Sequence, residues 1–556
     1  MIATKLRPHL AKLLLGSIFL VLSTSTVVWT LRDRTPPAWD PSDHIRYAFD
    51  YYRLLAHADF AGVAREFFTV PHYYAPMVHL VSACVFLILG ATRLTGIAVN
   101  LLSLGILLWS VASISRRLYG DALPTQAASS IAPAVLPGLL AACYHFSAWL
   151  MHDAFLDFPL TAAVAAGFAL LIRADDFRDR RRAIAFGVAA GLGMLVKQTF
   201  AFFFVLPGLY VAIRIIRTRD RRAILNLALA VVMLILVAAV WYAPHFRDVI
   251  AIYRENQRAA VSENEAPLFS FDSNFFYIHA LISMQMQLPL GVLFAVGLVY
   301  SLFRRRKQSA ILYLWLLSGI ISFALVANKD VRYTVPVLPA AAVLSVCWLR
   351  EFKAPTRKIV AALKSALVAI LAAWALVSFF NAQWPRPGFG TAIDTPRYRW
   401  MVFARNYYGF DHRPLNDDWN VPEVVQKVSN LGREADPSST PVLGVVVNLP
   451  YLSPSSVALY ARLLTRERAA APIVDVRWIV EPWMIDRLEE CDYVLVRTGL
   501  DKADWVAPVE RDFERLIRDN PARFRLIASC PIPMPDAQAV VYQYLGAQAA
   551  SPYTLR

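Results

Sequence analysis

Long apolar runs limit what this chain can fold into more than any other feature of its sequence. Runs of roughly 18–22 residues recur from Leu10 to Phe380, and from Asn381 onward they stop. About 20 apolar residues in a helix are the length that crosses a bilayer. The sequence therefore predicts a polytopic membrane protein with a soluble C-terminal part. It excludes a single soluble globule, a disordered chain and a disulfide-stapled secreted domain.

Basic residues gather at the ends of alternate apolar runs. The chain has a formal net charge of +15, although only 17% of its residues are charged. Arginine and lysine cluster within 178–182, 214–222, 304–307 and 350–358. Because cytoplasmic loops of membrane proteins are rich in these residues, we assign these clusters to the cytoplasmic side. This topology accounts for much of the net charge and requires no nucleic-acid partner.

The order of the runs predicts about 11–13 transmembrane helices. Leu13–Leu31 is too long for a signal-peptide core, so we expect a retained first helix followed by a large external loop over residues 32–75. Three runs then lie between residues 76 and 155, where the chain must cross an even number of times. One of them must be re-entrant or split, and the last contains Pro133 and Pro137, which can break a helix. An odd total places the N-terminus inside and the tail outside.

Residues 381–556 have the pattern of a soluble α/β domain, whereas 1–380 form an all-α membrane bundle. Short β-like runs occur at 442–447, 473–478, 492–497, 524–528 and 539–545, with helical stretches at 455–465 and 507–519. The tail contains no GxGxxG, P-loop or metal motif. Its Cys491 and Cys530 could pair if the tail is extracytoplasmic, but sequence separation alone does not decide this.

Charged residues near apolar runs are the candidates for function, because charges are costly at membrane depth. In the first external loop, a helix after Pro41 would place Asp43, Tyr47 and Asp50 on one face and Arg46 and Arg53 on another. Such a helix is also typical of a solvated amphipathic segment on the membrane surface.

Two further external groups combine carboxylates and cations. Asp153 and Asp157 are four residues apart at the mouth of a helix, where they repel and need a cation, a lysine or arginine partner, or a shared proton. Asp157, followed closely by a proline, also suits an ordinary helix start. Lys197 stands alone between apolar stretches and either snorkels or pairs. Lys329, Arg332 and Tyr333 follow another run; cations are unexpected on this side.

Together these residues suit transfer of a group from a lipid-linked phosphate. A carboxylate can accept the proton of an incoming hydroxyl. Fixed arginine and lysine side chains can hold the departing phosphate, whose negative charge grows in the transition state.

Six short elements resemble, in order, those of one family over nearly all of Leu10–Leu349. The family is the bacterial branch of the membrane glycosyltransferases with the C-type fold, which includes protein O-mannosyltransferases and lipid A aminoarabinose transferases. The matching elements are Asp43-His44-Ile45-Arg46-Tyr47-Ala48, His72-Tyr73-Tyr74-Ala75-Pro76-Met77, Arg116-Arg117-Leu118-Tyr119-Gly120, Leu156-Asp157-Phe158-Pro159-Leu160, Gly193–Lys197 and Lys329–Pro339.

The resemblance implies roles for these residues. Asp43 corresponds to the family's catalytic carboxylate. The residues implied to contact the donor phosphate are Arg46, Lys197, Arg332 and Lys329. Those implied to line the cavity are Asp157, Asp153, His44, Tyr47, His72 and Tyr333.

Two departures from the family pattern bear on chemistry. His44 replaces the acidic second residue of the first element, which weakens any scheme with two carboxylates or a metal. Tyr74 and Ala75 replace a basic residue and a proline, so a phosphate contact is missing or is supplied by His72. The sequence requires no cofactor and leaves a divalent metal open, since no ligand spacing supports one.

These observations predict an inner-membrane glycosyltransferase that works on its extracytoplasmic face. It would take a sugar from a polyprenyl-phosphate carrier with inversion and pass it to a lipid, glycan or protein acceptor. The alternative from another class is a secondary transporter or lipid flippase, which would show inverted repeats and charges near the bilayer midplane. A third possibility makes the tail a module that recruits the acceptor while the bundle anchors it.

Overall fold

The chain forms two compact units. One comprises Met1–Leu31 and Leu54–Arg413, and the other comprises Arg32–Arg53 and Pro414–Arg556. The structure is a computed structural model, and it describes residues 2–69, 74–119, 132–262, 265–304, 307–350, 358–386, 390–403, 412–465, 471–502 and 506–546.

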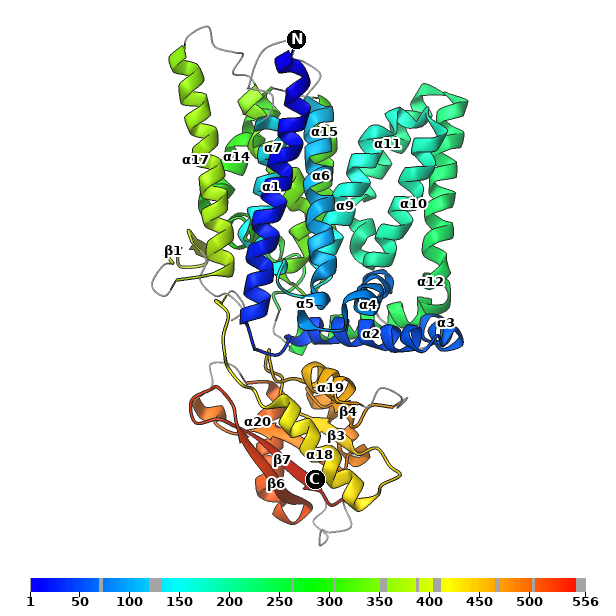
Figure 1. The fold of residues 1–556 in the computed structure, drawn as a ribbon, viewed down its shortest axis with the longest axis vertical. Helices are drawn as coiled ribbons and strands as arrows, with labels where there is room; N and C mark the ends of the chain where they lie inside the picture. Colours follow the sequence, from blue (N-terminus) through cyan, green and yellow to red (C-terminus); the bar gives the residue numbers. More distant parts are fainter. Residues whose placement is uncertain are drawn as a thin grey trace. The chain divides into compact units, whose positions relative to one another are not determined.

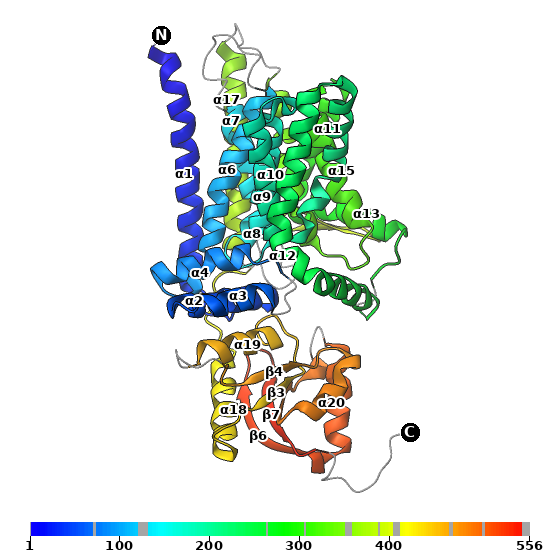
Figure 2. The same ribbon diagram turned by 90° about the vertical axis from the view of Figure 1, so that its right-hand side faces the viewer.

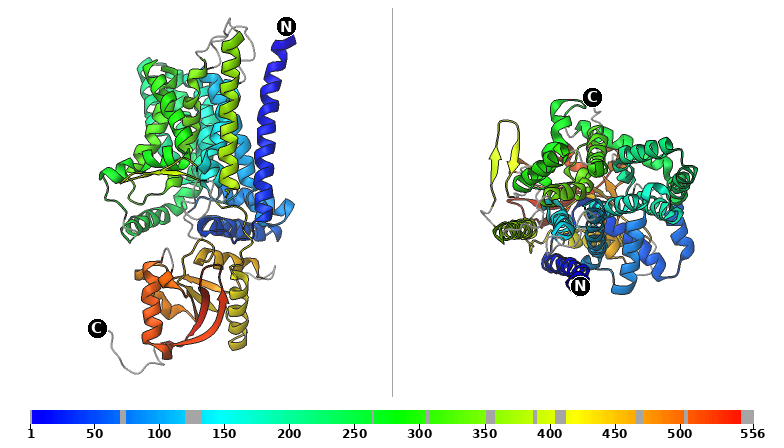
Figure 3. Two further views of the ribbon diagram at one scale, coloured as in Figure 1. Left: turned by 90° about the vertical axis from the view of Figure 1, so that its left-hand side faces the viewer. Right: turned by 90° about the horizontal axis from the view of Figure 1, so that it is seen from above.

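The first unit is a helical bundle (Figure 1). Its α-helices are α1 (Ile2–Arg32), α3 (Phe60–Phe68), α4 (Met77–Leu89), α5 (Arg93–Gly96), α6 (Ala98–Tyr119), α7 (Ala132–Cys143), α8 (His145–Leu150), α9 (Asp157–Arg173), α10 (Arg180–Val196), α11 (Val205–Thr218), α12 (Arg221–Ser262), α13 (Phe271–His279), α14 (Leu288–Phe303), α15 (Ala310–Ala324), α16 (Leu338–Ser345) and α17 (Lys358–Gln383). A short hairpin of β1 (Ala392–Asp394) and β2 (Arg399–Met401) projects from its side (Figure 3).

Close helix packing holds the middle of the bundle together. Helix α10 runs along α12, and at Gly187 a side chain would lie 2.3 Å from the carbonyl oxygen of Ala230. Small residues allow such approach in membrane bundles, where van der Waals packing rather than water exclusion joins helices. Helices α1 and α17 lie at the edge of the bundle (Figures 1 and 3) and remain largely exposed to the surroundings.

Several helices are broken where the chain approaches the ends of the bundle. Helix α12 contains Pro244, and its last part turns away from the bundle (Figure 2). Helix α10 ends at Val196, Lys197 is extended, and a 3-10 turn, η3 (Gln198–Phe203), follows. The chain bends by 120° at the break between Phe271–Gln285 and Leu288–Phe303. At such a break the chain leaves the helix axis, so backbone groups and polar side chains come to lie near the end of the bundle.

The described residues contain five helices that are long and apolar enough to cross a membrane, or up to six if the bent pair is one span. The chain is thus a multi-pass membrane protein. Several predicted runs fold as helices that are too short to cross, such as the 13 residues of Met77–Leu89 and the 15 residues of Ala310–Ala324. The predicted total of 11–13 spans therefore stays a prediction.

The segment between residues 76 and 155 shows how three apolar runs differ. Helix α4 lies at the end of α6 rather than along it (Figures 1 and 2), whereas α6 has 22 residues and is a span by length when joined to α5. The third run is split at Tyr144 into α7 and α8.

The second unit is built on a five-stranded mixed sheet. The strand order is β4-β3-β5-β7-β6. Strands β4, β3 and β5 pair in parallel, and β7 pairs antiparallel with both of its neighbours, β5 and β6. Helices α18 (Val421–Ala435) and α20 (Pro508–Asp519) lie on opposite sides of it (Figures 2 and 3). The remaining elements are α2 (Trp39–Ala56, which continues into the first unit), α19 (Pro454–Leu463), β3 (Val442–Val445), β4 (Asp475–Trp478), β5 (Tyr493–Arg497), β6 (Phe524–Pro531) and β7 (Gln538–Tyr544).

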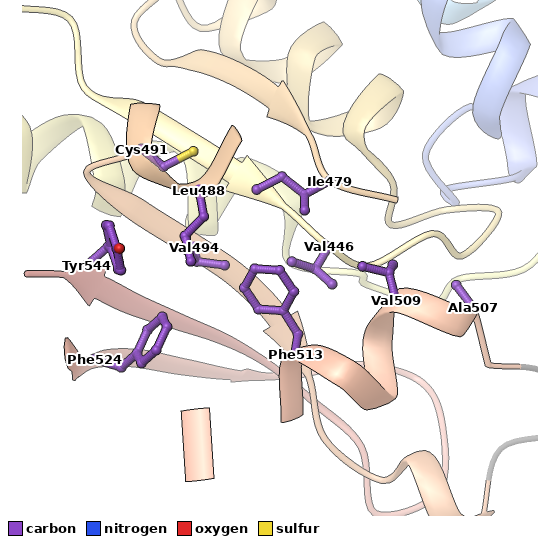
Figure 4. Close-up of a cluster of buried hydrophobic side chains, with 10 residues drawn as sticks. All are labelled: Val446, Ile479, Leu488, Cys491, Val494, Ala507, Val509, Phe513, Phe524 and Tyr544. Carbon is purple, nitrogen blue, oxygen red and sulfur yellow. The ribbon is translucent and has the colours of Figure 1, made fainter. Parts of the chain in front are cut away.

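All five strands and both helices predicted in the tail are present, so the α/β assignment is confirmed; α18 was not predicted. The core packs Phe513 and Val509 of α20 against Val446, Val494 and their neighbours (Figure 4). Cys491 belongs to this core, and it and Cys530 are buried free thiols, so the pairing considered above does not form.

The division of the chain follows contacts rather than hydropathy. Sequence composition places a boundary at residues 380 and 381, and α17 indeed ends at Gln383. By contact, residues up to Arg413 belong with the bundle, and the external-loop segment Arg32–Arg53 belongs with the tail. The residue predicted to be catalytic thus lies in the same compact unit as the sheet.

Candidate active site

Helix α2 carries the first candidate residues. It begins at Trp39, with Pro41 in its first turn, where a missing N–H costs no hydrogen bond. Its first turns are largely buried, including Asp43 and His44, and the backbone N–H of Trp39 donates to the carbonyl of Pro450. The helix predicted after Pro41 is therefore present. It packs on the tail residues of its own unit rather than standing free in solvent.

Asp43 is a buried carboxylate with partners on both oxygens. The Arg46 guanidinium donates to Oδ1 from Nη2 at 3.0 Å and from Nε at 3.3 Å, and the Ser455 hydroxyl donates to Oδ2 at 2.7 Å. Burial raises the pKa of Asp43, while the charge of Arg46 and the hydrogen bond from Ser455 act in the opposite direction. A carboxylate with a raised pKa is a better proton acceptor.

The contact between Asp43 and Arg46 corrects one prediction. We expected Arg46 on a different face from Asp43, but residues three apart on a helix are neighbours, and the two form an ion pair. The Arg46 guanidinium also lies over the ring of Tyr47, 4.4 Å from its centroid. Any phosphate bound by Arg46 would share this side chain with Asp43.

Two other candidate residues of this loop, Asp50 and His44, also lie on α2. Asp50, two turns beyond Asp43, forms an ion pair with Arg462 of α19. His44 is buried at 5% exposure. His72 lies outside the described residues.

A second group lies in the bundle unit, where three elements meet. Asp157, in the first turn of α9, is 2% exposed, and Lys197 donates to its Oδ1 at 2.8 Å. The Lys197 ammonium also lies 5.7 Å from the ring centroid of Tyr333, in the 3-10 segment η6 (Val331–Val337). The structure therefore brings together Lys197, Asp157 and Tyr333. The lone lysine pairs rather than snorkels.

Gly193 explains how Lys197 reaches this place. A side chain on Gly193 would lie 2.3 Å from the ring of Phe200, so the glycine leaves room for this ring one turn past the end of α10. The chain can then fold back into η3 directly after Lys197. The Gly-x-x-x-Lys spacing in the sequence thus has a packing cause.

The start of η6 and the loop before it contain the other predicted cations, Arg332 and Lys329. Arg332 pairs with Asp330 through Nη2 at 2.6 Å and Nε at 2.8 Å, and its guanidinium lies 4.4 Å from the ring centroid of Phe155. Lys329 donates to the carbonyls of Phe323 and Ala324, the last two residues of α15, and of Val326 just after it. These three acceptors match the three donors of an ammonium group. A phosphate contact by Lys329 would have to replace one of them.

Asp153 contacts the backbone around it, and the site holds no cluster of metal ligands among the described residues. Asp153 accepts the backbone N–H of Ala154, and its carbonyl accepts from Asn100 at 2.5 Å. In the parts of the chain described above, no group of three or more His, Cys, Asp or Glu side chains is placed to hold a metal ion. Asp43, Asp157 and Asp330 are each paired with a cation instead.

Sequence reasoning missed the tail residues that contact α2. Ser455 and Arg462 lie in α19, and neither belongs to a recognisable catalytic motif. The run Ser453-Pro454-Ser455-Ser456 does signal a helix start, and Ser453 and Ser456 form a capping box there. Nothing in the sequence connects this helix start to a carboxylate 412 residues away.

Comparisons with known proteins agree with this fold. Residues 72–242, less than half of the chain, match the family model described as dolichyl-phosphate-mannose-protein mannosyltransferase. The crystal structure of ArnT from Cupriavidus metallidurans in the apo state is 14% identical, with a TM-score of 0.56, over 97% of this chain and 99% of that one. The same protein bound to undecaprenyl phosphate gives 15% identity and a TM-score of 0.51 over the same shares.

A third structure is the arabinofuranosyltransferase AftD from Mycobacteria, 13% identical with a TM-score of 0.50, over 96% of this chain and 40% of that one. None of the curated protein sequences compared with the chain matches it. Over part of its length the chain thus matches a mannosyltransferase family model, and over nearly all of it the fold is similar to that of the membrane protein ArnT.

Proposed function

We propose that the protein transfers a sugar from a polyprenyl-phosphate carrier to an acceptor with inversion, and that Asp43 is the base. The observation that carries this proposal is the buried Asp43 carboxylate, held between Arg46 and Ser455 on a helix of the first external loop. The similar fold of ArnT, solved with undecaprenyl phosphate, supports the choice of donor.

The reaction needs one displacement at the anomeric carbon. The acceptor hydroxyl or amine gives its proton to the Asp43 carboxylate as its lone pair attacks C1 of the sugar. The bond from C1 to the phosphate oxygen breaks, and the electron pair leaves with the polyprenyl phosphate. Attack opposite to the leaving group inverts C1. Because phosphate departs as an anion, it needs no proton from a general acid at neutral pH.

Fixed cations serve the leaving group in this scheme. We assign Arg46, Lys197 and Arg332 to the donor phosphate, whose negative charge grows as the bond breaks. Each is already ion-paired with a carboxylate, namely Asp43, Asp157 and Asp330. Such pairs hold the cations in fixed orientations before the donor arrives. Lys329 stays a weaker candidate because its donors are occupied by backbone carbonyls.

On the positive-inside rule the reaction takes place on the extracytoplasmic face of the inner membrane, together with the tail. The acceptor is a lipid, glycan or protein.

Replacing Asp43 by asparagine tests the assigned base. Asp43→Asn keeps the shape of the side chain but cannot accept a proton, so we expect transfer to fall by about 10²–10⁴-fold. The assay uses the full-length protein in detergent or nanodiscs with an undecaprenyl-phosphate-linked sugar. Asp486→Asn, which removes an exposed carboxylate of the same unit, should leave transfer unchanged.

Three outcomes would contradict the proposal. Transfer at the normal rate by Asp43→Asn would show that the base is another group. Transfer from a nucleotide-linked sugar in preference to the lipid-linked one would exclude the donor class. A product with the donor's anomeric configuration, read by NMR, would exclude single displacement.

A further inference from the structure

We propose that Ser455, in the C-terminal part of the chain, is a positioning residue for Asp43 during sugar transfer. This inference rests on the function proposed above and adds the tail to the reacting machinery. It starts from a contact that the fold creates between distant segments. The Ser455 hydroxyl donates to Asp43 Oδ2 at 2.7 Å, and both residues are buried, at 2% and 8% exposure.

The Ser455 hydroxyl has no role in the start of its own helix. Ser455 is the second residue of α19, where the Ser453 side chain accepts from the Ser456 N–H and the Ser456 side chain accepts from the Ser453 N–H. The Ser455 hydroxyl points instead to Asp43. The positive end of the α19 dipole then faces a carboxylate, which also favours the ionised form. An alanine at this position would remove the contact without removing the cap.

Other contacts fix α2 on the tail at both ends. Before the helix, the Arg34 N–H donates to the Leu415 carbonyl, and the Leu415 N–H donates to Asp33 Oδ1 at 2.8 Å. Two turns after Asp43, Asp50 pairs with Arg462, near the end of α19. Ser455 thus acts between two anchor points, so the orientation of Asp43 is set by residues of α19.

The geometry leaves Asp43 able to react. A carboxylate has about four lone-pair sites on its two oxygens. Arg46 occupies Oδ1, and Ser455 occupies one site on Oδ2. The second site on Oδ2 remains for the proton of the acceptor. Because Arg46 and Ser455 both donate to the carboxylate, its rotation is restricted, and the second lone pair of Oδ2 points in a fixed direction.

Ser455 also changes the proton affinity of Asp43. Among the described residues of their unit, the charged and titratable groups that act on Asp43 are Arg46, Asp40 and Tyr47. The hydrogen bond from Ser455 lowers the pKa of Asp43, whereas burial and the charge of Asp40 raise it. Loss of this bond therefore raises the pKa. A base must be ionised to act, so the acidic limb of the rate profile would move to higher pH.

The test compares rate against pH for Ser455→Ala, Ser455→Thr and a control in the full-length protein. We expect kcat of Ser455→Ala to fall by about tenfold to a hundredfold, as for loss of a hydrogen bond to a charged group, with its acidic limb moved to higher pH. Ser455→Thr, which keeps the hydroxyl, should restore most of the rate and the position of the limb. Ser438→Ala, whose hydroxyl bonds the exposed Asp436, should match the unaltered protein.

Several outcomes overturn the inference. An acidic limb that does not move in Ser455→Ala would mean that the hydroxyl does not act on the base. A faster rate in this variant would mean that the hydroxyl competes with the acceptor. A threonine variant as slow as the alanine variant would show that the hydroxyl is not what matters. If Asp43→Asn is inactive while Ser455→Ala behaves normally, the proposed function stands and this inference alone fails.

Discussion

At the scale of single residues, carboxylates hold three of the candidate cations, Arg46, Lys197 and Arg332, and backbone carbonyls hold Lys329. The buried pair of Lys197 and Asp157 shows this most clearly, since its side chains are 11% and 2% exposed. From the sequence, Asp157 was expected to have a cation partner, a shared proton or a helix-start role, and Lys197 either to pair or to snorkel. The sequence did not indicate that these two residues pair with each other, because they are 40 positions apart and meet only after helices α9 and α10 have packed.

Removing one member of this pair should cost more than removing both. Lys197→Met leaves the Asp157 charge buried without a partner, which typically costs about 3–5 kcal/mol. We expect a lower melting temperature in detergent and, under the proposed function, weaker donor binding. The double variant Asp157→Asn with Lys197→Met should recover part of the melting temperature, whereas Lys427→Met, an exposed lysine, should not change it. Equal losses in the single and double variants would mean that the pair is not coupled.

At the scale of elements, the break after α10 decides where Lys197 lies. Apolar runs predict that a helix exists, but not that it ends one residue before a lysine. The end depends on Phe200 packing into the space beside Gly193, a contact between the helix and the turn that follows it. The same applies to α7 and α8, which read as one run and divide at Tyr144.

Adding a methyl group at Gly193 should displace this break. In Gly193→Ala the new carbon would come within 2.3 Å of the Phe200 ring, so the ring and the neighbouring Lys197 must move. We expect a higher KM for the lipid-linked donor and a lower rate. Gly208→Ala in α11 is the matched control, because nothing lies within 4 Å of its added carbon. Similar kinetics in both variants would mean that the packing at Gly193 does not position Lys197.

At the scale of the whole molecule, the compact units do not follow the hydropathy boundary. The segment Arg32–Arg53 precedes almost the entire bundle in sequence, yet it belongs to the unit built on the tail sheet. The stability of this sheet should therefore affect Asp43. Its core holds a buried ion pair, in which Arg497 donates to Glu510 from Nε at 2.7 Å and from Nη2 at 2.9 Å.

Breaking the pair of Arg497 and Glu510 tests whether the stability of the tail sheet affects transfer through Asp43. Glu510→Gln leaves the Arg497 guanidinium buried and also weakens the hydrogen bond from the Ala507 N–H. The expected loss is about 3–5 kcal/mol in the tail unit, seen as faster amide hydrogen exchange in its strands, together with slower transfer. Asp512→Asn, which removes a carboxylate from an exposed pair with Arg515, should change neither quantity. Normal transfer by a Glu510→Gln protein with a loosened sheet would separate the tail from catalysis.

The sequence by itself determined the class of fold, the α/β tail and the residues that carry the family elements. Hydropathy, strand alternation and short motifs are local properties, so they can be recognised without knowing which distant residues are in contact. Only the tertiary structure decided the partners of those residues: Arg46 and Ser455 for Asp43, Asp157 for Lys197, and Asp330 for Arg332. Pairs such as Asp43 with Ser455, 412 residues apart, depend on how the whole chain packs, and no local pattern records that.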